Sequence, residues 1–511
     1  MRTLRRQARG ADTRNGTGNL RKNSRGDRVM TRIDILSESD LQRIHEKSLH
    51  LLAKTGLRVD TRKGRQILEQ AGAVIRKGAN VVRFPEDLVE RSIKAAPRRF
   101  TLGGRRSAWS FAVNSGNNTL CLNGEGTLVI DRDSAEARPA TRRDWLEATR
   151  LADFTDEVGI YWRMVTPHDL GESMADFVDG ATDVFRNFSK HVMDPFMSPD
   201  QAPWLLEILQ TIFGDRETIK KTHPYSTLLC PQSPLMITAE YTDAYLALKG
   251  WNIPVAVMPM ALMGATAPAS MLGTLIQCNC EVLASLCLVQ AHEPGAPFLY
   301  APALTLMDPR TGRYFSGGVE NAVMNGAVVE LAAYYGFPVM ASGFGTDAFI
   351  PSRQGGYERA LNAALPLLKW PDILVGPGLY GGDMMLSFDQ LLVDLEVVRM
   401  IRQMHRGIDT GDDRWLEDVI ERVGPGGNYL MEKSTLESLR SGEWYLPQLG
   451  VHDSYENWSD NGRPTLALEA RERVARILSS HRPETLDENV ERELGRIHAA
   501  AKRVRGRYPL V

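Results

Sequence analysis

The side chains best suited to chemistry lie in a glycine-rich loop that runs from Ser342 to Glu358. The loop carries two carboxylates, Asp347 and Glu358, and one amide, Gln354. If the end of the loop is helical, Gln354 and Glu358 are four residues apart and share a face. We therefore predict that Glu358 and Gln354 act together as catalytic groups, with Asp347 beside them. Asp347 could equally serve as a helix cap or an Asx-turn residue.

Aromatic residues on the predicted functional loops could bind a cation that has no N–H to donate. Such a cation is recognised by ring faces and nearby carboxylates. The predicted substrate-binding rings are Trp162, Phe344, Phe349, Tyr357 and Tyr380. Trp162 lies within an apolar strand and could equally be a core residue, whereas Phe344 lies between two glycines, which a core residue rarely needs. Because Tyr357 is adjacent to Glu358, only one of them should face the site.

Other chemistries lack the motifs that they require. The sequence has no Gly-x-Ser-x-Gly elbow and no Walker loop. Cys278 and Cys280 are two residues apart, so on a helix they would point to opposite sides, and neither His-x-x-x-His nor Cys-x-x-Cys occurs. We therefore expect no metal site.

The elements that must position these residues alternate between short apolar strands and longer helices. Seven such units predict an α/β fold, a (β/α)8 TIM-type barrel over residues 141–408, whose site lies in the loops after the strands. The predicted strands are 158–166, 189–194, 225–230, 254–260, 297–303, 338–342 and 373–377. The eighth strand is left open between a predicted hairpin at 120–131 and the region after 425.

A second glycine-rich loop follows the last predicted strand. Its glycines, predicted to bind a cofactor, are Gly376, Gly378, Gly381 and Gly382. Without a Cβ they would let a flat cofactor face approach the backbone. Barrels often bind phosphate after a late strand, but no basic residue lies beside this loop, which disfavours phosphate.

The predicted barrel has extensions at both ends. Residues 30–140 are expected to form a helical and hairpin module, and residues 409–511 a polar helical extension. Residues 1–29 hold eight Arg and one Lys against two Asp, without an apolar pattern. We expect this segment to be a disordered basic tail, or an upstream extension before a start at Met30.

Composition excludes several classes of protein. The chain has 511 residues, of which 43% are hydrophobic, and a net charge of −2, which argues against wholesale disorder and nucleic-acid binding. Residues 250–280 carry no charge, but prolines and glycines interrupt them, so we predict a buried strand and a buried helix instead of a membrane span. Five cysteines in a chain of this length indicate a cytoplasmic enzyme.

Several short motifs along the chain are similar, in sequence and in order, to those of a known protein family. They are Leu36-Ser-Glu-Ser-Asp-Leu, Gly264-Ala-Thr-Ala-Pro, Cys280-Glu-Val-Leu-Ala, Glu293-Pro-Gly-Ala-Pro, Thr346-Asp-Ala and Gln354-Gly-Gly-Tyr-Glu. From about Ile35 to Gly407 the chain resembles the trimethylamine methyltransferase family. The founding members carry pyrrolysine, whereas this sequence has only standard residues. It is therefore similar to the non-pyrrolysine branch, which includes glycine betaine:corrinoid methyltransferases.

The resemblance implies a methyltransferase that moves a methyl group from a methylated amine, in that branch a quaternary amine, to the cobalt of a corrinoid (cobalamin) carried by a partner protein. No cofactor would be tightly bound to this chain, and we expect a homo-oligomer without nucleic-acid or membrane partners. One alternative is a barrel-fold quaternary-amine binding protein or sensor without corrinoid chemistry. Another is a decarboxylase or aldolase that uses Lys190 or Lys369, although Lys369 precedes a predicted strand and so lies at the wrong end.

Overall fold

The computed structural model describes residues 33–509 except 77, 79 and 125, together with the backbone of β1 (Arg21–Lys22) and β2 (Arg28–Met30). The rest of the basic segment 1–29 lies outside the described residues, so its character stays a prediction. The chain divides into two compact units, residues 1–34 with 402–445, and residues 35–401 with 446–511. The expected extension 409–511 is thus shared between the two units.

Eight parallel strands form a barrel, as predicted. An isolated parallel bridge between Tyr300 and Val339 links the first and last strands of the eight-stranded sheet and closes it. In chain order the strands are β8 (Thr119–Leu122), β11 (Val158–Tyr161), β12 (His191–Met193), β13 (Tyr225–Leu229), β15 (Val255–Val257), β17 (Phe298–Tyr300), β20 (Met340–Ser342) and β21 (Ile373–Val375). All seven strands predicted from the apolar runs are present.

The remaining barrel strand is β8, which begins at Thr119 and overlaps the start of the segment 120–131. It pairs in parallel with both β11 and β21, so the barrel begins before residue 141. The expected hairpin within 120–131 is wrong, because β9 (Leu128–Ile130) pairs with β10 (Ala137–Pro139) and with β23 (Met385–Leu386), and not with β8.

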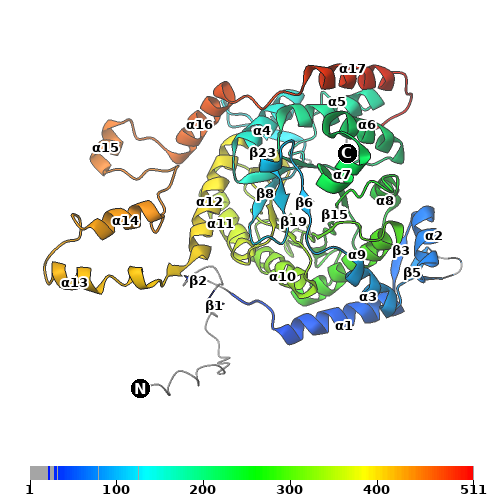
Figure 1. Ribbon diagram of the computed structural model, residues 1–511, viewed down its shortest axis with the longest axis horizontal. Helices are drawn as coiled ribbons and strands as arrows, with labels where there is room; N and C mark the ends of the chain where they lie inside the picture. The colour runs from blue at the N-terminus through cyan, green and yellow to red at the C-terminus, as the bar shows by residue number, and fades with distance from the viewer. Residues whose placement is uncertain are drawn as a thin grey trace. The chain divides into compact units, whose positions relative to one another are not determined.

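Helices surround the strands on the outside of the barrel (Figure 1). In chain order they are α4 (Arg142–Phe154), α5 (Met174–Asn187), α6 (Ala202–Phe213), α7 (Arg216–Thr222), α8 (Ala239–Leu246), α9 (Met271–His292), α10 (Val319–Tyr335), α11 (Arg353–Leu368) and α12 (Phe388–Arg406). α4 and α5 begin with capping boxes at Thr141 and Ser173, in which side chain and backbone satisfy each other's free groups. Sequence analysis predicted seven of these helices and missed α5 and α7.

Among the described residues α9 is the one helix long and apolar enough to cross a membrane. It packs beside the barrel, and 78% of its most apolar window is buried inside the protein. The prediction of a buried strand and a buried helix in this uncharged stretch is confirmed by β15 and α9.

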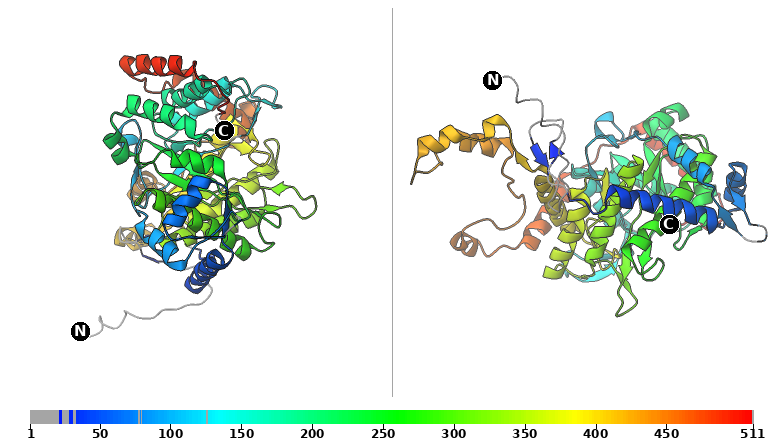
Figure 2. Two further views of the ribbon diagram at one scale, coloured as in Figure 1. Left: turned by 90° about the vertical axis from the view of Figure 1, so that its right-hand side faces the viewer. Right: turned by 90° about the horizontal axis from the view of Figure 1, so that it is seen from below.

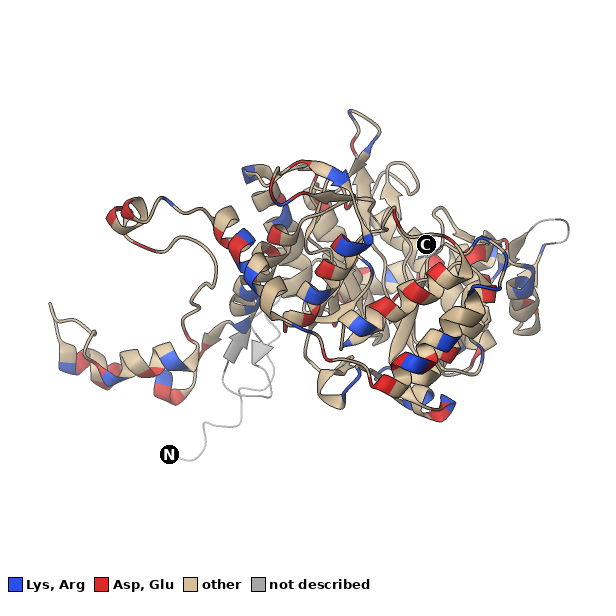
Figure 3. Ribbon diagram, turned by 90° about the horizontal axis from the view of Figure 1, so that it is seen from above, with Lys and Arg blue, Asp and Glu red and all other residues tan. Residues whose placement is uncertain are grey.

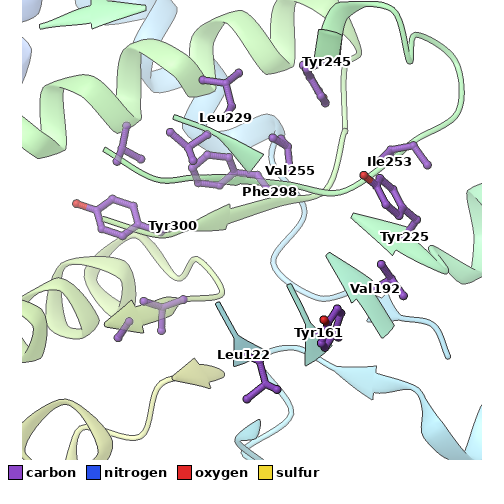
Figure 4. Close-up of a cluster of buried hydrophobic side chains, with 14 of the residues drawn as sticks. Leu122, Tyr161, Val192, Tyr225, Leu229, Tyr245, Ile253, Val255, Phe298 and Tyr300 are labelled. Carbon is purple, nitrogen blue, oxygen red and sulfur yellow. The ribbon is translucent and has the colours of Figure 1, made fainter. Parts of the chain in front are cut away.

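Two apolar layers follow from the alternation of side chains along each strand. Residues such as Ile160, Leu228 and Leu299 fill the inside of the barrel. Their neighbours Tyr161, Leu229 and others belong to a second apolar layer between the strands and the helices, part of which Figure 4 shows. The strands are therefore apolar on both faces, as a parallel sheet covered by helices requires.

Short strands form a rim at the carboxyl ends of the barrel strands. A three-stranded sheet joins β16 (Leu262–Met263), β18 (Thr305–Met307) and β19 (Tyr314–Phe315), and a four-stranded sheet joins β10, β9 and β23 to β22 (Leu379–Tyr380). The hairpin β18–β19 projects from the barrel (Figure 2). Both sheets follow barrel strands along the chain, so they build up the end at which barrel enzymes carry their sites.

The N-terminal module combines three helices and a small sheet. Its helices and strands are α1 (Glu38–Lys54), α2 (Arg62–Gln70), α3 (Glu86–Ala95), β3 (Leu57–Val59), β4 (Val74–Ile75) and β5 (Val81–Arg83), with β14 (Met236–Ile237) added from the barrel, and β6 (Thr101–Leu102) and β7 (Phe111–Ala112) as a separate hairpin. α1 packs against α9. Glu330 of α10 accepts hydrogen bonds from the backbone N–H groups of Ile35 and Leu36, at 2.9 Å each, just before α1.

The start of α1 offers a test of helix capping. The Ser37 hydroxyl accepts from the Asp40 backbone N–H at 3.2 Å, and Asp40 accepts in return from the Ser37 N–H. Ser37→Ala should lower the free energy of unfolding by about 1 kcal/mol, measured by urea denaturation. Ser480→Ala, at an exposed helix end, is the matched control. Equal midpoints for the two variants would contradict the capping role.

The C-terminal helices are divided between the two units. α15 (Tyr455–Asp460), α16 (Leu466–Ser480) and α17 (Glu488–Ala501) belong with the barrel, where α17 packs against α5 and α6. β24 (Ile408–Asp409), which pairs with β2, α13 (Glu417–Val423) and α14 (Lys433–Ser441) belong to the other unit. Basic and acidic residues are interspersed along the helices that are visible in Figure 3.

Candidate functional site

The carboxylate of Glu358 is the centre of a hydrogen-bond network beside the loop that follows β20. The Thr346 hydroxyl donates to Glu358 Oε2 at 2.6 Å, and the Asp347 backbone N–H donates to the same oxygen at 3.0 Å. Gln354, one turn earlier on α11, donates through Nε2 to Oε1 at 2.9 Å. The prediction that Gln354 and Glu358 share a helix face is confirmed, and the buried carboxylate is held by three donors.

Asp347 binds the segment that lies over Glu358. Its carboxylate accepts from the backbone N–H groups of Ser316, at 3.1 Å, and Gly317, at 2.8 Å, in the loop after β17. A Cβ on Gly317 would lie 2.5 Å from the Glu358 carboxylate carbon, so only glycine fits there. Burial raises the pKa of Asp347 above its ordinary value, with repulsion from Glu358 as a smaller cause. The carboxylates of Asp347 and Glu358 therefore both lie against the backbone at Ser316 and Gly317.

Two of the predicted rings, Phe344 and Tyr380, contact a cation of the protein itself, Arg359. The guanidinium carbon of Arg359 lies 5.8 Å from the Phe344 ring centroid and 5.4 Å from that of Tyr380. Arg359 pairs with Asp394 and donates to the Leu379 carbonyl. Phe344 and Tyr380 are almost fully buried. We therefore correct the expectation that these rings line a substrate cage, because neither presents a face to a ligand.

Trp162 also proves to be a core residue. Its side chain is 5% exposed and packs inside the barrel in the cluster that includes Ile160, Met193 and Met258. Its backbone N–H donates to the Leu122 carbonyl at 3.0 Å, which continues the pairing of β11 with β8. The alternative that the sequence left open, core packing, therefore describes Trp162.

Phe349 and Tyr357 are the predicted rings that remain accessible. Phe349 is 70% exposed and Tyr357 is 58% exposed, which is unusual for large apolar side chains. Both lie after the carboxyl end of β20, on the loop and helix that carry Glu358. Their expected role in binding substrate stays a prediction.

The four glycines of the second loop are required by the packing of the chain itself. A Cβ on Gly376 would lie 2.1 Å from the Gly343 carbonyl oxygen, and one on Gly378 would meet Leu391 at 3.1 Å. Gly381 and Gly382 each lie directly against an aromatic ring. These contacts account for the glycines without a ligand, and their predicted role in cofactor binding stays untested.

Comparison with known proteins identifies the family. A family model described as trimethylamine methyltransferase (MTTB) matches residues 2–505. The chain belongs to the trimethylamine methyltransferase family. Trimethylamine methyltransferase MttB of Desulfitobacterium hafniense is 31% identical over 454 residues, which cover 89% of this chain and 91% of the relative. A glycine betaine methyltransferase of Desulfitobacterium hafniense is 27% identical, with 91% and 96% covered.

Proteins from Methanosarcina species are also similar to this chain. Trimethylamine methyltransferase MttB1 of Methanosarcina mazei is 28% identical over 475 residues, with 90% of this chain and 94% of the relative covered. Among solved structures, the Methanosarcina barkeri monomethylamine methyltransferase (MtmB) aligns with a TM-score of 0.45 and 12% identity, over 91% of this chain and 94% of that one.

Sequence analysis of this family member missed two residues at the rim of the barrel. Tyr314 lies on β19, and its hydroxyl donates to Asp383 Oδ2 at 3.4 Å. Tyr314 is 44% exposed, and desolvation by the surrounding protein raises its pKa above the ordinary value. The signal for Asp383 was its place directly after Gly381 and Gly382. Nothing local marked Tyr314, because its partner is 69 residues away.

Proposed function

We propose that this protein transfers a methyl group from a methylated amine, most simply a quaternary amine, to the Co(I) corrinoid of a partner protein. The observation that carries the proposal is the match of the family model to residues 2–505. Relatives are named for trimethylamine and for glycine betaine. The chain has only standard residues, which favours the quaternary amine.

For this reaction the main task of the protein is to position the reacting groups. The cobalt electron pair forms the new bond to the methyl carbon while the C–N pair leaves with nitrogen, so a quaternary amine departs as a neutral tertiary amine. The leaving nitrogen needs no proton. The protein must hold the C–N bond of the amine in line with the cobalt. This requirement agrees with a site in which hydrogen bonds fix the carboxylates of Glu358 and Asp347 and no nucleophile is evident.

Exposed apolar side chains around the rim support a protein partner at this end of the barrel. Each of them lies in the segment after β15, β17, β20 or β21, either in the loop or in the first two turns of the barrel helix that comes next in the chain. They are Met260, Met271, Leu272, Tyr314, Val319, Phe349, Ile350, Tyr357 and Met384, each at least 38% exposed. A concentration of this kind is typical of an interaction surface. A partner seated there would bring its corrinoid to the barrel mouth.

The Schiff-base alternative loses support from the placement of its lysines. Lys190 immediately precedes β12 and donates to the carbonyls of Thr155, at 2.6 Å, and Val158, at 2.7 Å. Lys369 pairs with Glu330 and precedes β21. Both lysines lie at the amino ends of strands, away from the rim.

Methyl transfer to cobalt can be measured directly. We expect the purified chain to convert cob(I)alamin absorbance to that of methylcobalamin with at least one of glycine betaine, carnitine, choline or trimethylamine. A tertiary amine as the only donor would show that the amine class is wrong. If no amine reacts with free or protein-bound Co(I), the corrinoid proposal fails, and amine binding without transfer would support the sensor.

A further inference from the structure

The turn after β22 holds an aspartate in a strained conformation. Gly381, Gly382 and Asp383 have φ values of +60°, +66° and +68°. Residues other than glycine that are held in this region are strained and are found most often at functional sites. The N–H groups of Gly381 and Gly382 donate to the carbonyls of Ala348, at 2.8 Å, and Thr346, at 2.9 Å. The turn is thereby fixed to the loop that carries Glu358.

Two exposed rings pack against this turn. A Cβ on Gly381 would lie 3.0 Å from Phe349, and a Cβ on Gly382 would lie 3.1 Å from Tyr314. The rings come from different loops, after β20 and after β17. Gly381 and Gly382 immediately precede Asp383, so the two rings pack within two residues of it, while Phe349 keeps 70% and Tyr314 keeps 44% of its surface accessible.

The Asp383 carboxylate forms no ion pair within the part of the chain that the structure describes, where its one hydrogen-bond donor is Tyr314, at 3.4 Å. The positive charge of Arg359 acts on the carboxylate and opposes the effect of burial on its pKa, but Arg359 itself pairs with Asp394. Asp308, on the same hairpin as Tyr314, instead pairs with Arg310 at 2.9 Å. Burial raises the pKa of Asp383 above its ordinary value. A partly desolvated carboxylate of this kind is stabilised by a cation placed beside it.

We propose that Asp383, Tyr314 and Phe349 bind the positive head group of the substrate, a quaternary ammonium. The head group has no N–H, so it requires ring faces and an unpaired carboxylate, and Asp383 is such a carboxylate. Glu358 and Asp347 are already held by protein donors and position the loop. This assignment rests on the proposed function and adds residues that specify the charge of the substrate.

Calorimetric titration of the full chain tests the assignment with a matched pair of ligands. Glycine betaine and 3,3-dimethylbutanoate have the same shape, but only the first is cationic at the head. The unmodified protein should bind glycine betaine at least about fivefold more tightly. Asp383→Asn should abolish that preference while the affinity for 3,3-dimethylbutanoate stays unchanged. Asparagine is tolerated at positive φ, so the thermal midpoint should be unchanged.

Other variants separate the contributions of ring and charge. Tyr314→Leu should weaken glycine betaine binding by about 2- to 30-fold, whereas Tyr314→Phe should keep it. Asp308→Asn is the control, because Asp308 is already paired with Arg310. A preference for glycine betaine that survives Asp383→Asn overturns the assignment and leaves the proposed function standing. An unmodified protein without the preference also overturns it, and methyl transfer from trimethylamine would then decide the function separately.

Discussion

Replacing Glu358 by glutamine is expected to slow methyl transfer by about 10- to 150-fold, because hydrogen bonds to a charged group contribute about 1.5–3 kcal/mol. Glu358 accepts from Thr346, Asp347 and Gln354 through both oxygens. Glutamine offers one oxygen, so either Gln354 must rotate its amide or a donor faces an NH2 group. The loop that carries Asp347 should then lose its fixed position. The rate of methylcobalamin formation measures the effect.

The control for this variant is Glu472→Gln on α16, where the carboxylate is 59% exposed and pairs with Arg476. It should transfer methyl groups at the unmodified rate. A Glu358→Gln protein with unchanged kcat and KM would contradict the role of the charged network. Circular dichroism and the thermal midpoint would show whether the variant remains folded.

Arg359→Met is expected to reduce the free energy of unfolding by about 3–5 kcal/mol, because removing one partner of a buried pair leaves the other charge uncompensated. Asp394 is fully buried and also accepts from Gly378 N–H at 2.7 Å. Phe344 and Tyr380 would lose the cation that lies between them. Urea denaturation measures the loss.

Two further variants test whether the loss of stability comes from the unpaired Asp394. Arg353→Met, at an exposed position on the same helix, should change stability little. The double variant Arg359→Met with Asp394→Leu should recover much of the lost stability, since apolar groups of similar size often replace buried pairs without loss. A double variant as unstable as the single one would contradict this account of the pair.

Local sequence patterns predicted the fold well where the signal was local. The seven apolar runs and the uncharged stretch around β15 and α9 all have the predicted structure. β8 was left uncertain because its two neighbours, β11 and β21, lie far away in sequence. The Gly-Glu-Gly segment beside it resembled a hairpin turn, and no local pattern reveals a partner so distant.

The candidate site was predicted in part for the same reason. Gln354 and Glu358 are one helical turn apart, and helix geometry alone brings them together. Phe344 was taken for a ligand-binding ring because glycines flank it. The structure shows instead that Phe344 has a φ of +62° and contacts Arg359, a cation whose position no local pattern predicts. Tyr314 and Asp383 meet only in three dimensions.

The pairing of β8 with β21 has a consequence for how the protein is made. Thr119 pairs with Ile373, so roughly 250 residues must leave the ribosome between the two strands. At about 5–20 residues per second this takes about 10–50 s. Throughout that interval the nascent barrel has an open edge at β8, and open edges invite pairing with other chains. Pairing of β21 with β8 removes this open edge once β21 has emerged.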